Sequence, residues 1–310
     1  MNSIFFEIKD IYKNFDEKTA LSSISLDIIK GEIFGIVGPD GSGKTTLLRI
    51  LAGILPFDSG NLKITGNEIK DSLSKIGYMP QRFALYPDLT LIENIMFYSE
   101  IYGVDKENQE KTIKDLLTSF SIYDFKNRKA GKLSGGMKQK LALACTLIHK
   151  PDILILDEPT NGVDPVSRRE FWNILYELRE KKVTIITSTS YLEEAERCSH
   201  VAFLYKGKVL SVDTVTNLKQ IKDNKMYYIT NENARKIYYD LIKNLGVPDL
   251  NLTGNSIKIF LNNNEKSDVL QKLENYLISN YKQNLKFKIG IPLLEDIFHY
   301  LVGLEEKNEL

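Results

Sequence analysis

The 310-residue chain has few cysteines and no excess of charge of either sign. Two cysteines, Cys145 and Cys198, are too few for a disulfide framework or a cysteine-rich zinc site, which favours a reducing compartment such as the cytosol. Lysine plus arginine and aspartate plus glutamate each number 41, so the formal net charge is zero. Proteins that bind nucleic acid mainly through its phosphates carry a basic excess, and we therefore expect no nucleic-acid partner.

Long hydrophobic runs are also lacking. Nowhere do about 18 apolar residues follow one another, which is the length that a membrane-spanning helix needs. The N-terminal segment has no basic region and only a short apolar run, so we expect no signal peptide. Any role at a membrane is therefore expected to be exercised from outside the bilayer. Apolar residues still make up 43% of the chain, enough for the cores of two domains.

The most informative segment is a glycine-rich turn between an expected strand at 32–37 and an expected helix at 46–52. Its sequence, GPDGSGKTT, fits the pattern G-x-x-x-x-G-K-[ST]. Such a turn directs several backbone N–H groups into one hollow at the positive end of the helix dipole, where phosphate oxygens bind. The predicted nucleotide-binding residues of this loop are Gly38, Asp40, Gly41, Ser42, Gly43, Lys44, Thr45 and Thr46.

Individual residues of this loop have separate expected roles. Gly41 and Gly43 can take the positive φ values that the loop requires. Lys44 is expected to neutralise the β- and γ-phosphates of ATP, and the Thr45 hydroxyl to ligate Mg²⁺. The alternative is an ordinary glycine-rich turn, but the flanking strand and helix argue against it.

A second chemical element is the apolar run at 153–156, which ends in Asp157 and Glu158. In a parallel sheet the carboxyl ends of the strands open onto the ligand crevice. We therefore expect Asp157 to lie near the Mg²⁺ held by Thr45 and to reach it through a water molecule. Glu158 is expected to hold the attacking water and accept its proton. The alternative is a solvated acidic turn.

A third element is the turn KLSGGMKQKLALA, in which Ser134, Gly135 and Gly136 precede or open an expected helix. By itself this is usually a capped helix start, but it also makes an anion-binding N-terminus. Because the chain already has one phosphate loop, a second such site suits a nucleotide held by a partner chain. With these three elements in this order, the chain resembles the ATP-binding cassette (ABC) family over roughly residues 4–215, where this turn is the signature motif.

The resemblance implies further site residues. Gln81, within YMPQ, resembles the Q-loop residue, which reaches Mg²⁺ and senses the transmembrane partner. Asp164, within NGVDP, is similar to the D-loop residue that crosses the dimer interface. Phe15 matches the position of the aromatic residue that stacks on adenine, with Tyr12 as the alternative.

One position departs from the family pattern. The family usually has a histidine, which hydrogen-bonds the γ-phosphate, at the place of Ser190. Ser190 with Glu193 also fits a capping box, so its expected structural role is a helix N-cap. A serine is several ångströms shorter than an imidazole and cannot bridge the same gap directly. The resemblance thus implies nucleotide binding and leaves catalysis through Ser190 in doubt.

Two domains are expected, at 1–217 and 218–310. The first is an α/β P-loop NTPase cassette with a mixed sheet core, an antiparallel subdomain and a helical signature subdomain between residues 105 and 149. The second alternates strand, helix, strand, strand, helix and strand, which predicts a small α+β ferredoxin-like domain.

The last part of the chain narrows the resemblance. The segment 291–303, IPLLEDIFHYLVG, resembles the ending of ATP-binding subunits of ABC-2 type exporters of the multidrug-type subgroup. This implies an ATPase with ATP and Mg²⁺ as cofactors, peripheral on the cytoplasmic face of the cell membrane. Its implied partners are an ABC-2 type transmembrane permease and a second cassette, in a homo- or heterodimer. The alternative is a regulatory or non-transport ABC ATPase with weak hydrolysis.

Overall fold

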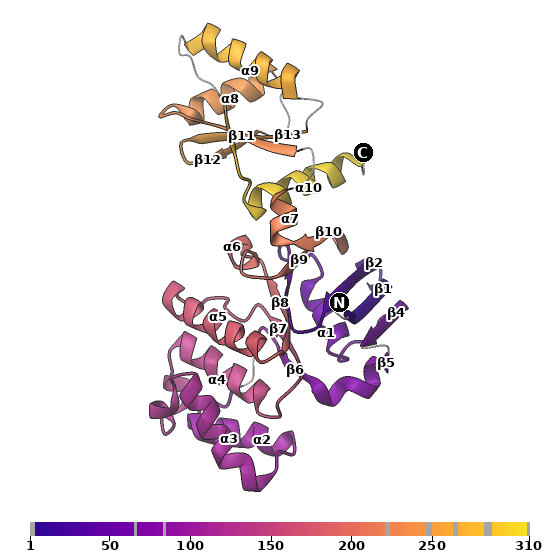
Figure 1. Ribbon diagram of the computed structural model, residues 1–310, viewed down its shortest axis with the longest axis vertical. Coiled ribbons are helices and arrows are strands. Elements are labelled where there is room, and N and C mark those ends of the chain that lie inside the picture. The colour runs from indigo at the N-terminus through magenta and orange to yellow at the C-terminus, as the bar shows by residue number, and fades with distance from the viewer. Residues whose placement is uncertain are drawn as a thin grey trace. The chain divides into compact units, whose positions relative to one another are not determined.

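The computed structural model in Figure 1 describes residues 4–64, 67–82, 85–220, 224–245, 250–262, 266–281 and 287–308. Contacts divide the chain into two compact units, Met1–Val212 and Asp213–Leu310. The division falls five residues before the boundary that the sequence predicts after residue 217. The reason is that helix α7 (Val215–Lys219) contacts helix α10 (Leu294–Asn308) of the second unit.

An antiparallel sheet forms one part of the first unit. Its strands, in the order β2-β1-β4-β5, are β1 (Ile4–Phe15), β2 (Lys18–Ile29), β4 (Ser59–Ile64) and β5 (Asn67–Glu68). Buried and exposed residues alternate from Ile24 to Ile28, so one face of β2 joins the core. The sequence pattern predicts these first two strands at 4–9 and 23–28, and both are longer in the structure because their pairing continues to Phe15 and Lys18 at the hairpin.

A second sheet forms the centre of the first unit. Its strands, in the order β10-β9-β3-β8-β7-β6, are β3 (Ile33–Val37), β6 (Ile76–Met79), β7 (Ile153–Asp157), β8 (Thr184–Thr189), β9 (His200–Tyr205) and β10 (Lys208–Thr214). Every residue of β3, β7 and β8 is buried, as expected for strands covered on both faces. The pairs β6–β7, β7–β8, β8–β3 and β3–β9 are parallel, so the carboxyl ends of these strands open on one edge.

The helices of the first unit fall into two groups. Those next to the central sheet are α1 (Lys44–Leu51), α5 (Pro165–Glu180) and α6 (Leu192–Ala195). A separate group, gathered at one end of this unit in Figure 1, consists of α2 (Leu91–Ile101), α3 (Lys106–Ser119) and α4 (Gly135–Leu147). This group is the predicted helical subdomain. It begins before residue 105, because Thr90 and Glu93 form a capping box at the start of α2.

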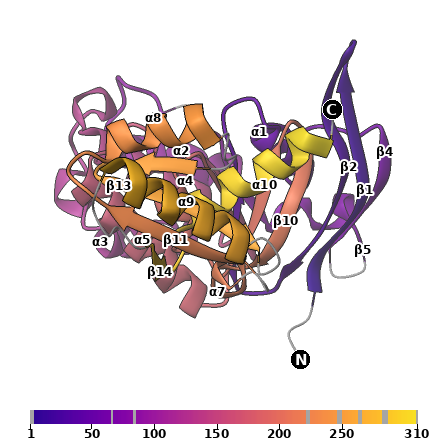
Figure 2. The same cartoon turned by 90° about the horizontal axis from the view of Figure 1, so that it is seen from above.

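The second unit has the predicted ferredoxin-like arrangement. Its strands and helices are β11 (Asn224–Thr230), α8 (Ala234–Leu245), β12 (Leu250–Thr253), β13 (Ser256–Asn262), α9 (Lys266–Tyr281) and β14 (Lys288–Gly290), followed by α10. The antiparallel sheet has the order β12-β13-β11-β14. In Figure 1, α8 and α9 lie on one side of this sheet and α10 on the other, and Figure 2 shows α9 running across β11 and β13. The sequence pattern predicts the last strand at 285–289, and residues 285 and 286 of that range lie outside the described residues.

Among the described residues, no helix combines the length and the apolar character that crossing a membrane requires.

Candidate functional site

The glycine-rich loop joins β3 to α1 and needs its glycines for steric reasons. Gly41 and Gly43 have φ values of 78° and 105°, in the left-handed region that side chains disfavour. A Cβ at Gly38 would lie 2.1 Å from the carbonyl oxygen of Leu204, so this position excludes a side chain. Helix α1 starts at Lys44, two residues earlier than the sequence pattern predicts, and Gly43 is its N-cap residue. The first backbone N–H groups of α1 therefore open into the loop.

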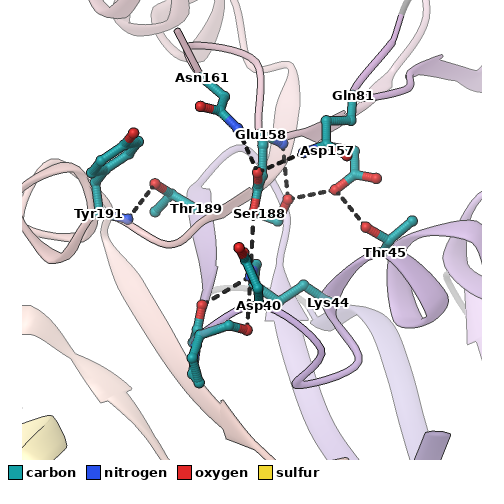
Figure 3. Close-up of polar contacts among 12 residues, drawn as sticks. Asp40, Lys44, Thr45, Gln81, Asp157, Glu158, Asn161, Ser188, Thr189 and Tyr191 are labelled. Carbon is teal, nitrogen blue, oxygen red and sulfur yellow. Dashed lines mark hydrogen bonds and ion pairs between the residues drawn. The ribbon is translucent and has the colours of Figure 1, made fainter.

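Lys44 is held inside this loop. Its side chain is buried, and its Nζ donates to the carbonyl oxygens of Gly38 at 2.8 Å and Pro39 at 3.1 Å. The same Nζ lies 3.2 Å from Oε1 of Glu158, which is also buried, and 4.0 Å from the exposed Asp40 (Figure 3). The ammonium group is thus oriented by backbone carbonyls and paired with the carboxylate of Glu158, which directly follows β7.

Glu158 stands at the end of β7 in an unusual backbone conformation. Its φ is 48°, a value that is uncommon for a residue with a side chain and is found disproportionately at functional sites. Its Oε2 accepts hydrogen bonds from Nε2 of Gln81 at 2.9 Å and Nδ2 of Asn161 at 3.1 Å. The carboxylate is therefore held at three points, by an ammonium group and two amides (Figure 3).

Asp157 lies one residue earlier and contacts a different set of groups. Its Oδ1 accepts from the hydroxyls of Thr45 at 3.1 Å and Ser188 at 2.8 Å. Ser188 also accepts from the backbone N–H of Glu158 at 2.9 Å, so one hydroxyl holds both carboxylate residues. No motif in the sequence points to Ser188 as a site residue. The register of β7 and β8 pairs it directly with Asp157, and only that long-range pairing brings it to the site.

The prediction that Ser190 caps a helix is wrong. Helix α6 begins at Leu192, and its N-cap residue, Tyr191, makes no side-chain capping bond. Thr189 instead takes the local hydrogen bonds: its hydroxyl accepts from the N–H of Tyr191 at 3.0 Å and donates to Glu194 at 2.8 Å. The chain buries Glu194, not the Glu193 of the expected capping box, because Thr160 and Arg168 also contact that carboxylate. Ser190 itself is exposed.

Some of these groups line one cleft of about 890 Å³, which we call the phosphate-loop cleft, whereas Asp157 and Ser188 lie outside its lining. Its wall includes Lys44, Thr45, Gln81, Glu158 and Ser190 together with Phe15 at the end of β1. Phe15 is 47% exposed and has the Nζ of Lys13 at 5.5 Å from its ring centre. Tyr12, the alternative aromatic residue, is not part of the lining, so the geometry favours Phe15 as the base-stacking side chain.

The signature turn does not line the phosphate-loop cleft. Ser134 is the N-cap of α4, where its hydroxyl accepts from the N–H of Met137 at 3.3 Å. A Cβ at Gly136 would lie 2.4 Å from that of Ser167, so close packing of α4 against α5 requires glycine there. Ser134 and Gly135 are both exposed.

Asp164 caps α5, whose first residue is Pro165. Its Oδ1 accepts from the N–H groups of Val166 at 3.1 Å and Ser167 at 3.0 Å. Hydrogen bonds from Ser167, the backbone bond first, lower the pKa of Asp164 from its ordinary value. The aspartate is therefore fixed as an anion at a helix N-terminus, where the dipole also favours negative charge.

The donor set suits a nucleotide polyphosphate and a small divalent cation. The Ser42 hydroxyl is buried in the loop without a hydrogen-bond partner among the described residues, as expected of a group that a phosphate oxygen would satisfy. Thr45 and Asp157 bring a hydroxyl and a carboxylate oxygen within 3.1 Å of each other, and oxygen ligands of this kind suit Mg²⁺. Gln81, the third predicted ligand, has its amide nitrogen on Glu158 in this conformation.

Comparisons with known sequences agree with this donor set. The family model described as ABC transporter matches residues 21–161. The chain is 31% identical over 304 residues to the linearmycin resistance ATP-binding protein LnrL of Bacillus subtilis, covering 98% of that protein. It is also 38% identical over 311 residues to the probable multidrug ABC transporter ATP-binding protein YbhF of Escherichia coli. The chain spans only 53% of the length of this second relative.

Solved structures of ABC transporter cassettes are similar over a large part of the chain. The ATP-binding subunit of an ABC transporter is similar over 70% of this chain and 92% of that chain, with 27% identity and a TM-score of 0.62. A dimeric bacterial ABC transporter cassette is similar over 67% of this chain and 98% of that one, with 26% identity and a TM-score of 0.62.

Proposed function

Because the chain belongs to the family of ABC transporter ATP-binding proteins and carries their ATPase cassette, we propose that it energises an ABC-2 type exporter by ATP-driven dimerisation. In this proposal two cassettes close on ATP on the cytoplasmic face of the cell membrane, next to a separate transmembrane permease. The relatives named for multidrug transport and linearmycin resistance support the exporter class. The segment 291–303, which resembles the ending of ABC-2 type subunits, supports it as well.

The observation that carries the proposal is that the first unit holds two halves of a nucleotide site in different places. The phosphate-loop cleft contains the ammonium group of Lys44, the carboxylate of Glu158 and the ring of Phe15. Ser134 and Gly135 are exposed outside this cleft. These two residues sit at the start of α4, where N–H groups and the helix dipole attract an anion. A second cassette, packed head to tail, would place its signature turn over the nucleotide of the first.

The proposed roles of the residues follow from their contacts. Lys44 is positioned to neutralise the β- and γ-phosphates, and Phe15 to stack on the base. Glu158 is the general base, because two amides orient its carboxylate toward the cleft. Thr45, Asp157 and Gln81 would hold Mg²⁺, which on binding supplies positive charge to the phosphate oxygens.

Lys44 and Glu158 are paired with each other at 3.2 Å in this conformation. Phosphate oxygens entering the loop compete with the glutamate for the same ammonium group. ATP binding therefore has to release Glu158 from Lys44, and that release frees the carboxylate to accept a proton from water. The base is held inactive by the same cation that recognises the substrate.

We also propose that ATP turnover is slow, because Ser190 stands where the family usually has a histidine. Ser190 is exposed on the wall of the phosphate-loop cleft, and its hydroxyl makes no hydrogen bond among the described residues. A donor aimed at transition-state charge contributes on the order of 10²–10³ in rate, and no imidazole stands here to supply it. A mostly regulatory cassette, or one that borrows a complete site from a second cassette, would both fit this feature.

The test is Glu158→Gln, which keeps the shape and the amide contacts but removes the proton acceptor. Static light scattering with Mg²⁺ and ATP is expected to show a stable dimer of this variant, because closure proceeds and cleavage fails. The matched control is Glu193→Gln, which changes the net charge by the same amount at an exposed residue of α6. If Glu158→Gln stays monomeric with its own permease supplied in detergent, ATP-driven dimerisation is refuted.

A further inference from the structure

The second unit contains a hollow of about 260 Å³ between α10 and the sheet face that α8 and α9 leave uncovered. Alternation along β13 creates this face: Ile257 and Ile259 join the core under α8 and α9, whereas Lys258 and Phe260 alternate with them. On α10, Asp296, His299 and Tyr300 also line the hollow. Their spacing of three and four residues places them on one helix face.

One end of the hollow is polar, and it offers N–H donors that are not yet hydrogen-bonded within the described residues. Lys258 Nζ donates to both carboxylate oxygens of Asp296, at 3.0 and 3.3 Å, and the two side chains are only 16% and 9% exposed. Asp296 also accepts from the N–H of Leu293 at 2.9 Å. The carboxylate thus accepts three of the about four hydrogen bonds that its two oxygens can take, and the ammonium group donates two of its three, so that one N–H donor remains. The side chains of Asn251 and His299, which line the hollow as well, add further N–H donors.

The other end is apolar and aromatic. Phe260 from the sheet and Tyr300 from α10 are in contact, with 4.7 Å between ring centres and an angle of 47° between the ring planes. Met226, which pairs with Phe260 across the sheet, completes this wall, and a methionine side chain adapts readily to the shape of an apolar ligand. A hollow lined by apolar groups with a few convergent donors is the usual form of a small-molecule site.

We propose that this hollow binds a small carboxylate that carries an aromatic or branched apolar body. The carboxylate would accept from Lys258, Asn251 and His299, and the apolar body would lie against Phe260, Tyr300 and Met226. A cationic ligand is disfavoured because Asp296, the carboxylate in the lining, is already engaged. The volume lies below the ~300–1,000 Å³ typical of drug-sized ligands, so the hollow is too small to enclose a nucleotide. This site is separate from the nucleotide site of the first unit.

The experiment is ligand-observed saturation-transfer NMR on the full chain, with phenylacetate as the probe and phenylacetamide as its uncharged counterpart. ATP is present in excess so that the phosphate loop of the first unit does not bind the probe. Phenylacetate is expected to bind in the millimolar range, and phenylacetamide about tenfold more weakly, because it lacks the charge that strengthens the hydrogen bond to Lys258.

Lys258→Met is expected to weaken phenylacetate binding about tenfold. The matched control is Lys288→Met: Lys258 and Lys288 both pair with Tyr228 across the sheet, yet Lys288 is exposed and does not line the hollow. Asn251 pairs with Lys258 across the sheet, so Asn251→Trp is expected to fill the hollow and abolish phenylacetate binding, and it decides the matter if Lys258→Met fails to fold. The proposal is overturned if the wild type shows no saturation transfer to phenylacetate at about 10 mM, or if phenylacetamide binds as tightly as phenylacetate. It is also overturned if Asn251→Trp still binds phenylacetate, or if Lys288→Met weakens binding as much as Lys258→Met does.

Discussion

Removing one buried hydroxyl, that of Ser188, is expected to destabilise the first unit by about 3 kcal/mol. Ser188 is fully buried; it donates to Asp157 at 2.8 Å and accepts from the N–H of Glu158 at 2.9 Å. A hydrogen bond to a charged group contributes about 1.5–3 kcal/mol, and a buried N–H left without a partner costs about 1–3 kcal/mol. Asp157 keeps its bond from Thr45, which places the expected loss in the lower half of the combined range.

The assay is urea unfolding of the nucleotide-free protein, followed by tryptophan fluorescence. Trp172 is the single tryptophan of the chain and is buried in α5, so its emission reports on the first unit alone. The control is Ser190→Ala, which deletes the same atom from an exposed position two residues away and is expected to change stability by less than about 0.5 kcal/mol. Equal unfolding midpoints for the two alanine variants would refute the reasoning.

Three further predictions address the cleft and the cysteines. Phe15→Ala is expected to weaken ATP binding by about 1–3 kcal/mol in calorimetry, whereas Tyr12→Ala, outside the cleft lining, should leave it unchanged; the reverse result would move the stacking ring to Tyr12. Ser190→His is expected to raise the ATPase rate of the purified protein by at least about tenfold, and an unchanged, already brisk rate would show that no group is missing there. Burial raises the pKa of both thiols, Cys145 and Cys198, so a thiol reagent such as dithionitrobenzoate should react only after unfolding, and prompt reaction of the native protein would contradict the burial.

Local sequence was sufficient for the features that depend on neighbouring residues. The phosphate loop, the carboxylates after β7 and the order of strands and helices in the second unit all follow from glycine spacing, apolar runs and periodicity. The fold class is confirmed in both units. The roles assigned to the site residues stay predictions, although the structure brings Lys44, Thr45, Gln81 and Glu158 to one cleft.

What the sequence could not supply depends on pairing between distant segments. Ser188 reaches Asp157 only through the register of β7 and β8, which no local pattern reveals. The capping box expected at Ser190 fits the sequence spacing, but the tertiary contacts of Glu194 with Thr160 and Arg168 compete with it. Several hydrogen bonds to a buried carboxylate stabilise the fold by more than a helix cap at the surface, which contributes about 1 kcal/mol.

The contacts of Glu194 have a mechanical consequence. This buried carboxylate joins Thr189 at the end of β8, Thr160 after β7 and Arg168 on α5. Arg168 lies one helical turn from Asp164, the residue that caps α5, and its guanidinium also covers the ring of Tyr191 at 4.8 Å. Three short segments are thus joined to α6 through a single carboxylate. If a neighbouring molecule displaced the N-terminal end of α5, Thr189 and Tyr191 would therefore move with it. The rim of the phosphate-loop cleft and the N-terminal end of α5 would then move as one rigid body.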